Sequence, residues 1–121
     1  MDQYLLKEIR VIDLTRNVAG PFATMILGDL GAEIIKIEHP EKGDDTRHWG
    51  PPFFDGAAPS YLELNRNKQS LALNLAAPEA AGIMARLVEN ADVLVESFRP
   101  GALDKLGFGP EWARQLNPEL I

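Results

Sequence analysis

Short apolar runs in this chain alternate with longer segments in which apolar residues recur every three or four positions. Residues 9–14 are rich in β-branched side chains and predict a buried strand, and residues 33–38 predict a second one. Between them, Pro21 opens a segment with helical spacing, and Gly31 is placed to end that helix. The first third of the chain therefore predicts two parallel strands joined by a right-handed helical crossover.

The middle of the chain predicts another strand, helix and strand. Residues 70–75 alternate apolar and polar side chains, which is typical of a strand. A helix is expected to open at Pro78 and to end near Asn90, and residues 92–96 predict the next strand. The order β-α-β-loop-β-α-β-α indicates an α/β fold, with an open, mainly parallel, Rossmann-like sheet and helices on both faces.

The last twenty residues predict two short helices, over residues 103–106 and 110–116. Residues 119–121 then resemble the start of a further strand that stops at once. We therefore expect residues 1–121 to form a single domain that is incomplete at its C-terminus.

Residues 39–59 form the longest stretch without periodicity, and a loop of this length in a small domain is usually functional or mobile. It carries Trp49, Phe53 and Phe54. Packing of these rings within the loop or against a partner subunit is a better interpretation than a ligand platform.

Composition excludes several classes of function. The 121 residues carry a formal net charge of −6, which disfavours binding to nucleic acid or to an anionic membrane surface. The absence of cysteine excludes disulfides, thiolate nucleophiles and cysteine-based zinc sites. The N-terminus lacks the features of a secretory signal, and no apolar run is long enough to span a bilayer. A cytoplasmic location is the default expectation.

Three polar corners follow or precede the predicted strands, at residues 15–21, 65–70 and 96–101. Ligands of doubly wound sheets bind beyond the carboxyl ends of the strands, and basic side chains at these corners indicate an anionic small molecule. Each corner has a plainer interpretation: a tight turn with a helix cap, a solvated loop, and a solvated basic pair beside a turn, respectively.

Other site chemistries lack a matching motif. The chain has no dinucleotide fingerprint, no Walker motif and no nucleophile elbow. We expect no metal site, because the acidic and histidine residues near the end of the second strand match no known ligand spacing. These residues are Glu38, His39, Asp44, Asp45 and His48.

The chain resembles the class III CoA-transferases, which include formyl-CoA transferase, carnitine CoA-transferase and alpha-methylacyl-CoA racemase. Four segments carry the resemblance, in this order: VIDLTRNVAGPFATMILGDLGAEIIKIEHPEKGDDTR, LNRNKQSLALNL, ADVLVESFRPGALDKLGFG and LNPELI. Together they cover nearly the whole chain from residue 9 onward, and their order makes the resemblance specific.

The resemblance implies that coenzyme A lies against this Rossmann-like segment, with acyl-CoA and a carboxylic acid as substrates. The best-known transferases tend to have arginine where His39 and Lys105 stand. Lysine keeps the charge, whereas a histidine is mostly neutral near pH 7, so a phosphate contact at His39 is the weaker expectation. Carried over by position, the expected CoA contacts are Val18, Ala19, His39, Leu73, Asn74, Leu75, Ala76, Ser97, Phe98, Arg99 and Lys105.

The resemblance also implies transfer of CoA between carboxylic acids through an aspartyl anhydride and thioester. None of the aspartates here matches the nucleophile's motif, so the catalytic residue is expected beyond Ile121 and the 121-residue chain is expected to be inactive alone. Two alternatives remain, a 2-methylacyl-CoA racemase of the same family and a non-catalytic CoA- or nucleotide-binding module. The family forms interlocked homodimers, so exposed apolar surface is expected where the rest of such an assembly would pack.

Overall fold

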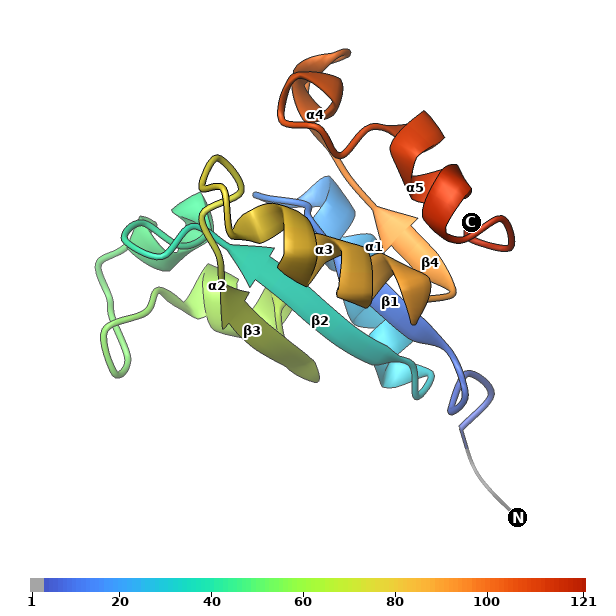
Figure 1. The fold of residues 1–121 in the computed structure, drawn as a ribbon. Helices are drawn as coiled ribbons and strands as arrows, with labels where there is room; N and C mark the ends of the chain where they lie inside the picture. The colour runs from blue at the N-terminus through green and yellow to red at the C-terminus, as the bar shows by residue number, and fades with distance from the viewer. Residues whose placement is uncertain (1–3) are drawn as a thin grey trace.

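The computed structural model describes residues 4–121 and contains a four-stranded sheet (Figure 1). The strands lie in the order β3-β2-β1-β4, and every neighbouring pair is parallel. This arrangement confirms the predicted α/β fold with a parallel sheet. The strands are β1 (Arg10–Asp13), β2 (Glu33–Glu38), β3 (Lys68–Ala72) and β4 (Val93–Val95).

The helices cover both faces of the sheet, as Figure 1 shows with α3 in front of the strands and α1 behind them. The chain passes from β1 to β2 and on to β3 in one direction, then returns to place β4 on the far side of β1. Right-handed crossovers therefore put α1 and α3 on opposite faces. The helices are α1 (Ala19–Asp29), η1 (Asp45–His48, a 3₁₀ turn), α2 (Pro59–Leu64), α3 (Ala80–Glu89), α4 (Ala102–Lys105) and α5 (Pro110–Leu116).

Alternation along β1 divides the core into two clusters. Ile12 and Leu14 pack with Met84 of α3 on one face. Val11 faces the other way and packs with Ile34 of β2. Both clusters are needed because a parallel sheet of this type is buried on its two faces.

The structure differs from the sequence prediction in the middle of the chain. The segment 39–59 was expected to lack regular structure, but it contains η1, and α2 follows directly from Pro59. Strand β3 begins at Lys68 and ends at Ala72, two to three residues earlier than predicted. The hydrophobic pattern misses this start because the side chains of Lys68 and Ser70, although polar, are held by buried carboxylates.

The C-terminal residue pairs with the free edge of β4. The Ile121 N–H donates to the Asp92 carbonyl at 3.0 Å, and the Leu94 N–H donates to the Ile121 carbonyl at 2.9 Å. These two bonds are those of a parallel strand beside β4, but only Ile121 makes them. The predicted strand over residues 119–121 is not formed, since Pro118 and Glu119 lie in a turn.

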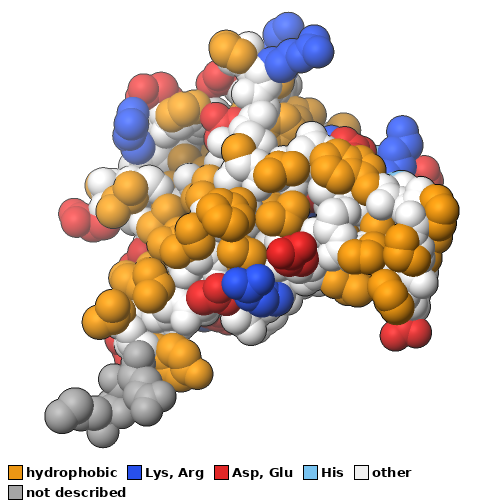
Figure 2. Space-filling view, turned by 180° about the vertical axis from the view of Figure 1, so that it is seen from behind, with side chains coloured by type: hydrophobic (Ala, Val, Ile, Leu, Met, Phe, Trp, Pro, Cys, Tyr) orange, Lys and Arg blue, Asp and Glu red, His pale blue; other side chains and the backbone are white. Residues whose placement is uncertain are grey.

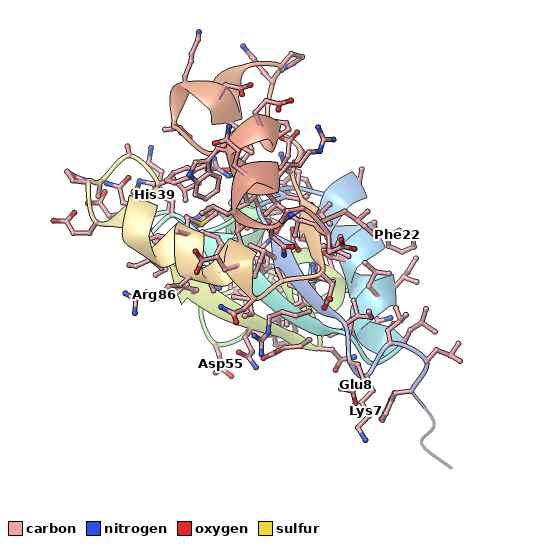
Figure 3. All side chains as sticks on the ribbon, turned by 45° about the vertical axis from the view of Figure 1, so that its right-hand side comes forward. Lys7, Glu8, Phe22, His39, Asp55 and Arg86 are labelled. Carbon is pink, nitrogen blue, oxygen red and sulfur yellow. The ribbon has the colours of Figure 1, made fainter. Side chains whose placement is uncertain are left out.

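Helix α1 presents an exposed apolar stripe to solvent. Phe22, Ile26 and Leu30 are each at least 39% exposed, and Val18 at the helix start continues the row at the same spacing of four. Figure 2 shows apolar side chains gathered on this side of the molecule, and Figure 3 shows Phe22 pointing away from the sheet. We call these four residues the α1 stripe.

No helix within residues 4–121 has the length and apolarity needed to cross a membrane.

Candidate functional site

The sheet has a topological switch point between β1 and β4. The segments after these two strands diverge, since β1 continues into α1 behind the sheet and β4 continues toward α4. A crevice opens where such connections part, and α/β proteins bind ligands there, beyond the carboxyl ends of the strands. Two adjoining clefts occupy this edge.

The first, which we call the central cleft, lies over the ends of β1, β2 and β3. It encloses about 250 Å³, with mainly apolar walls and polar groups between them. Such a lining suits a flat heterocycle with polar substituents. It is formed by Leu14, Arg16, Ile37, Glu38, His39, Leu73, Asn74, Leu75, Ala76, Phe98 and Leu106.

The second, which we call the switch-point cleft, lies between the ends of β1 and β4. It encloses about 400 Å³ and is more polar, with two arginines and one aspartate in its lining. It shares Leu14, Arg16 and Phe98 with the central cleft, so the two form one continuous depression. Its residues are Leu14, Arg16, Asn17, Asp45, Ser97, Phe98 and Arg99.

Eight of the eleven residues expected from the sequence line these clefts. His39, Phe98 and residues 73–76 line the central cleft, while Ser97, Phe98 and Arg99 line the switch-point cleft. Val18, Ala19 and Lys105 line neither cleft, and all three are exposed.

Tight turns position the residues of the central cleft. The side-chain oxygen of Asn74 accepts a hydrogen bond from the Ala76 N–H at 3.1 Å. The backbone carbonyl of Asn74 accepts one from the Ala77 N–H at 3.0 Å. The His39 Nδ1 accepts from the N–H groups of Glu41 and Lys42, at 3.2 and 3.4 Å. These two bonds fix the orientation of the His39 ring at the start of the loop.

A buried polar network supports the clefts from the α1 side of the sheet. Asp13 is fully buried, and its carboxylate accepts from the Thr15 N–H at 2.8 Å and from the hydroxyls of Thr15 and Thr24, both at 2.5 Å. Lys68 completes this group, with its Nζ 3.2 Å from Asp13 and 2.9 Å from the Pro21 carbonyl. Burial lowers the pKa of Lys68, and the charge of Asp13 opposes that effect.

A second ion pair fixes the turn after β1. Lys36 donates to the Asp44 carboxylate at 2.8 Å and to the Thr15 carbonyl at 2.9 Å. Asp44 also accepts from the Asn17 N–H at 3.3 Å. Burial alone would raise the pKa of Asp44, but the hydrogen bonds from Lys36 and the Thr46 N–H outweigh it and lower the pKa. Asn17 has a φ of 66°, a conformation that asparagine tolerates better than most residues.

Glu38 is the third buried carboxylate of the network. Arg47 binds it through two hydrogen bonds of 2.9 and 2.8 Å, Tyr61 donates at 2.9 Å, and Ser70 donates as well. The guanidinium of Arg47 also stacks 3.8 Å from the centre of the Tyr61 ring. Burial would raise the pKa of Glu38, but these donors together with the Asp44 N–H lower it to about 2. Glu38 is therefore a fixed anion, not a proton carrier at neutral pH.

Sequence reasoning missed two features of the site. Arg16 stands between the two clefts, with its guanidinium 5.6 Å from the centre of the Phe98 ring, but the sequence prediction placed it only within a turn. The buried ion pairs were missed because a lysine within an apolar strand, such as Lys36, gives no signal of its partner. The acidic residues in the loop that follows β2 could have indicated a partner for Lys36.

No group of three or more histidine, aspartate and glutamate side chains within the described range is arranged to hold a metal ion. The rings of Trp49, Phe53 and Phe54 are all about half exposed and line neither cleft.

Residues 6–121 match the family described as CoA-transferase family III. The chain is 49% identical over 116 residues to succinyl-CoA:glutarate CoA-transferase of Mus musculus, covering 96% of this chain and 27% of that protein. It is 48% identical to succinate–glutarate CoA-transferase of Agrobacterium fabrum, covering 96% of this chain and 30% of that protein.

Among solved structures, a CAIB/BAIF family protein from Brucella suis superposes with a TM-score of 0.94 at 42% identity, over 99% of this chain and 32% of that one. The chain thus spans about 27% to 30% of the length of these curated relatives. A match over nearly all of its residues shows that this chain belongs to CoA-transferase family III.

Proposed function

We propose that this chain is the CoA-binding part of an acyl-CoA:carboxylate CoA-transferase. The observation that carries the proposal is the continuous depression at the β1–β4 switch point, which brings together eight residues that were expected from separate parts of the sequence. In this proposal the adenosine occupies the central cleft, and the thiol-bearing arm extends over the switch-point cleft.

The relatives suggest the substrate class. Those from Mus musculus and Agrobacterium fabrum are named for succinate or its CoA thioester and for glutarate, which are short dicarboxylates. We therefore propose succinyl-CoA as the first donor to test and a short dicarboxylate as the acceptor.

The nucleophilic aspartate of the proposed reaction would come from outside these 121 residues. Asp13 and Asp44 support this, since both are buried and their carboxylates are occupied by structural hydrogen bonds. Asp45 is exposed and lines the switch-point cleft, but it does not match the motif of the family's nucleophile. We propose that the chain supplies binding and positioning, and that it does not transfer CoA by itself.

The homodimer expected from the resemblance and the cytoplasmic location expected from the sequence remain proposals. The α1 stripe supports the first, because a row of exposed apolar side chains on one helix is typical of a surface that is covered in an assembly. Val18 belongs to this stripe, so we propose that it contributes to that surface besides any contact with CoA.

Titration calorimetry tests the proposed function. The 121-residue chain is expected to bind CoA in a saturable, one-to-one manner and to bind adenosine more weakly, because adenosine fills only the central cleft. An assay with succinyl-CoA and glutarate is expected to give no turnover. Absence of CoA binding would contradict the proposal. Turnover of succinyl-CoA and glutarate by the 121-residue chain would contradict the claim that the nucleophile lies outside it.

A further inference from the structure

Arg16 occupies the boundary between the two clefts. It lines both of them, as does Phe98, and its guanidinium lies 5.6 Å from the centre of the Phe98 ring. A cation at this distance from an aromatic face is attracted to it. The guanidinium is therefore held at the boundary although the residue is exposed.

Arg16 also has no carboxylate partner, although the chain is acidic. Arg10, Arg47 and Arg66 each pair with a carboxylate within 2.8 Å. Within residues 4–121, no ion pair within 4.0 Å involves Arg16 or Arg99. Both of these arginines face the switch-point cleft, so the cleft offers two guanidinium groups whose donors are free for an anion.

The turn beneath Arg16 is rigid. The Thr15 carbonyl accepts from the buried ammonium of Lys36, and the Asn17 N–H donates to Asp44. These hydrogen bonds restrain the backbone on both sides of Arg16. A restrained backbone reduces the conformational entropy that is lost when Arg16 binds a ligand.

We propose that Arg16 binds the diphosphate of CoA, and this rests on the proposed function. A molecule with its adenosine in the central cleft and its pantetheine arm over the switch-point cleft must cross the boundary at Arg16 and Phe98. The diphosphate is the part of CoA that joins these two ends. The planar fork of arginine suits two phosphate oxygens at once.

Asp45 is the opposing charge in this cleft. It lines the switch-point cleft with Arg16 and Arg99 and is exposed. Its carboxylate repels a diphosphate, so it limits the affinity that the arginines provide. Substitution of Arg16 and of Asp45 should therefore change CoA affinity in opposite directions.

The test compares Kd values for the 121-residue chain of CoA, of dephospho-CoA, which keeps the diphosphate but lacks the 3′-phosphate, and of pantetheine, which lacks the diphosphate and the adenosine. We expect Arg16→Gln to weaken the binding of both CoA and dephospho-CoA by about tenfold or more and Arg16→Lys to weaken it less, with pantetheine binding unchanged. Asp45→Asn is expected to tighten CoA binding. Arg86→Gln is the matched control, because Arg86 is an exposed arginine in a separate cleft with Arg10 and Asn90.

The outcomes separate the two proposals. If the unsubstituted chain binds CoA and Arg16→Gln binds it within twofold, the role of Arg16 is wrong while the proposed function stands. A loss of affinity for pantetheine equal to that for CoA would also overturn the diphosphate assignment. If the unsubstituted chain does not bind CoA, both proposals fail. Thermal unfolding of Arg16→Gln checks that the fold is intact.

Discussion

The ammonium nitrogen of Lys36 lies 2.8 Å from a carboxylate oxygen of Asp44, and neither side chain is more than 1% exposed. Lys36 is in the middle of β2, and Asp44 lies in the loop that follows that strand. Because the same ammonium also binds the Thr15 carbonyl, the pair connects β2, its loop and the turn after β1. The pair thus anchors the turn and the loop that carry Arg16, Asn17 and Asp45, which line the switch-point cleft.

Lys36→Met is expected to lower the free energy of unfolding by about 3–5 kcal/mol, because it leaves Asp44 buried and unpaired. Urea unfolding at pH 7 measures this. The double variant Lys36→Met/Asp44→Leu removes both charges and should recover part of the loss. A single variant that unfolds within 1 kcal/mol of the parent chain, roughly the effect of a surface substitution, would contradict the pair's role.

Glu38→Gln is expected to make the free energy of unfolding depend less on pH in the acid range. The pKa of Glu38 falls from 4.5 to about 2 on folding, so its contribution is present above pH 4.5 and is lost as pH falls toward 2. The corresponding free energy is on the order of 3 kcal/mol. The difference in unfolding free energy between the parent and Glu38→Gln should therefore shrink between pH 5 and pH 2.5. A difference that stays constant over this range would count against the shifted pKa.

Gly20→Ala is expected to destabilise the chain by about 1–3 kcal/mol. A Cβ at Gly20 would overlap the Thr15 side chain, which Asp13 holds in place. Gly82→Ala is the matched control, since a Cβ at this position in α3 meets open space and should stabilise the helix by about 0.5–1 kcal/mol. Equal effects of the two substitutions would show that the close approach of Gly20 to Thr15 is unimportant.

Phe22→Glu is expected to shift the chain toward monomer in sedimentation velocity experiments. The side chain of Phe22 is 49% exposed in the middle of the α1 stripe, so the substitution should change stability little while adding charge to the proposed interface. Glu63→Gln on exposed α2 surface serves as a control. A parent chain that is monomeric at every concentration would contradict the proposed role of the α1 stripe.

The sequence was sufficient to predict the parallel sheet and eight of the fifteen residues that line the two clefts. The β-branched run at residues 9–14 and the helical spacing after Pro21 correctly predicted β1 and α1, because each element buries apolar side chains with a clear period. Residues of the corners at 15–21 and 96–101 line the clefts, since the carboxyl ends of parallel strands share one edge. The corner at 65–70 lines neither cleft, because it lies at the start of β3 and not at its carboxyl end.

Elements that are stabilised by polar contacts could not be predicted in this way. The start of β3 was misplaced because Lys68 is held by Asp13, and that contact joins residues 55 positions apart. Helix α2 was missed for a similar reason, as its buried Tyr61 binds Glu38 of β2. Such partners are set by the tertiary fold, and a single sequence contains no pattern that pairs them.

The most direct test of the central claim is a titration of the ¹⁵N-labelled chain with CoA, followed by amide chemical shifts. We predict that the largest changes fall on His39, on residues 73–76 and on Ser97, Phe98 and Arg99. Residues of the separate cleft that contains Arg86 should not respond. Arg86 and His39 are both labelled in Figure 3. Shifts confined to that second cleft, or no shifts at saturating CoA, would contradict the account.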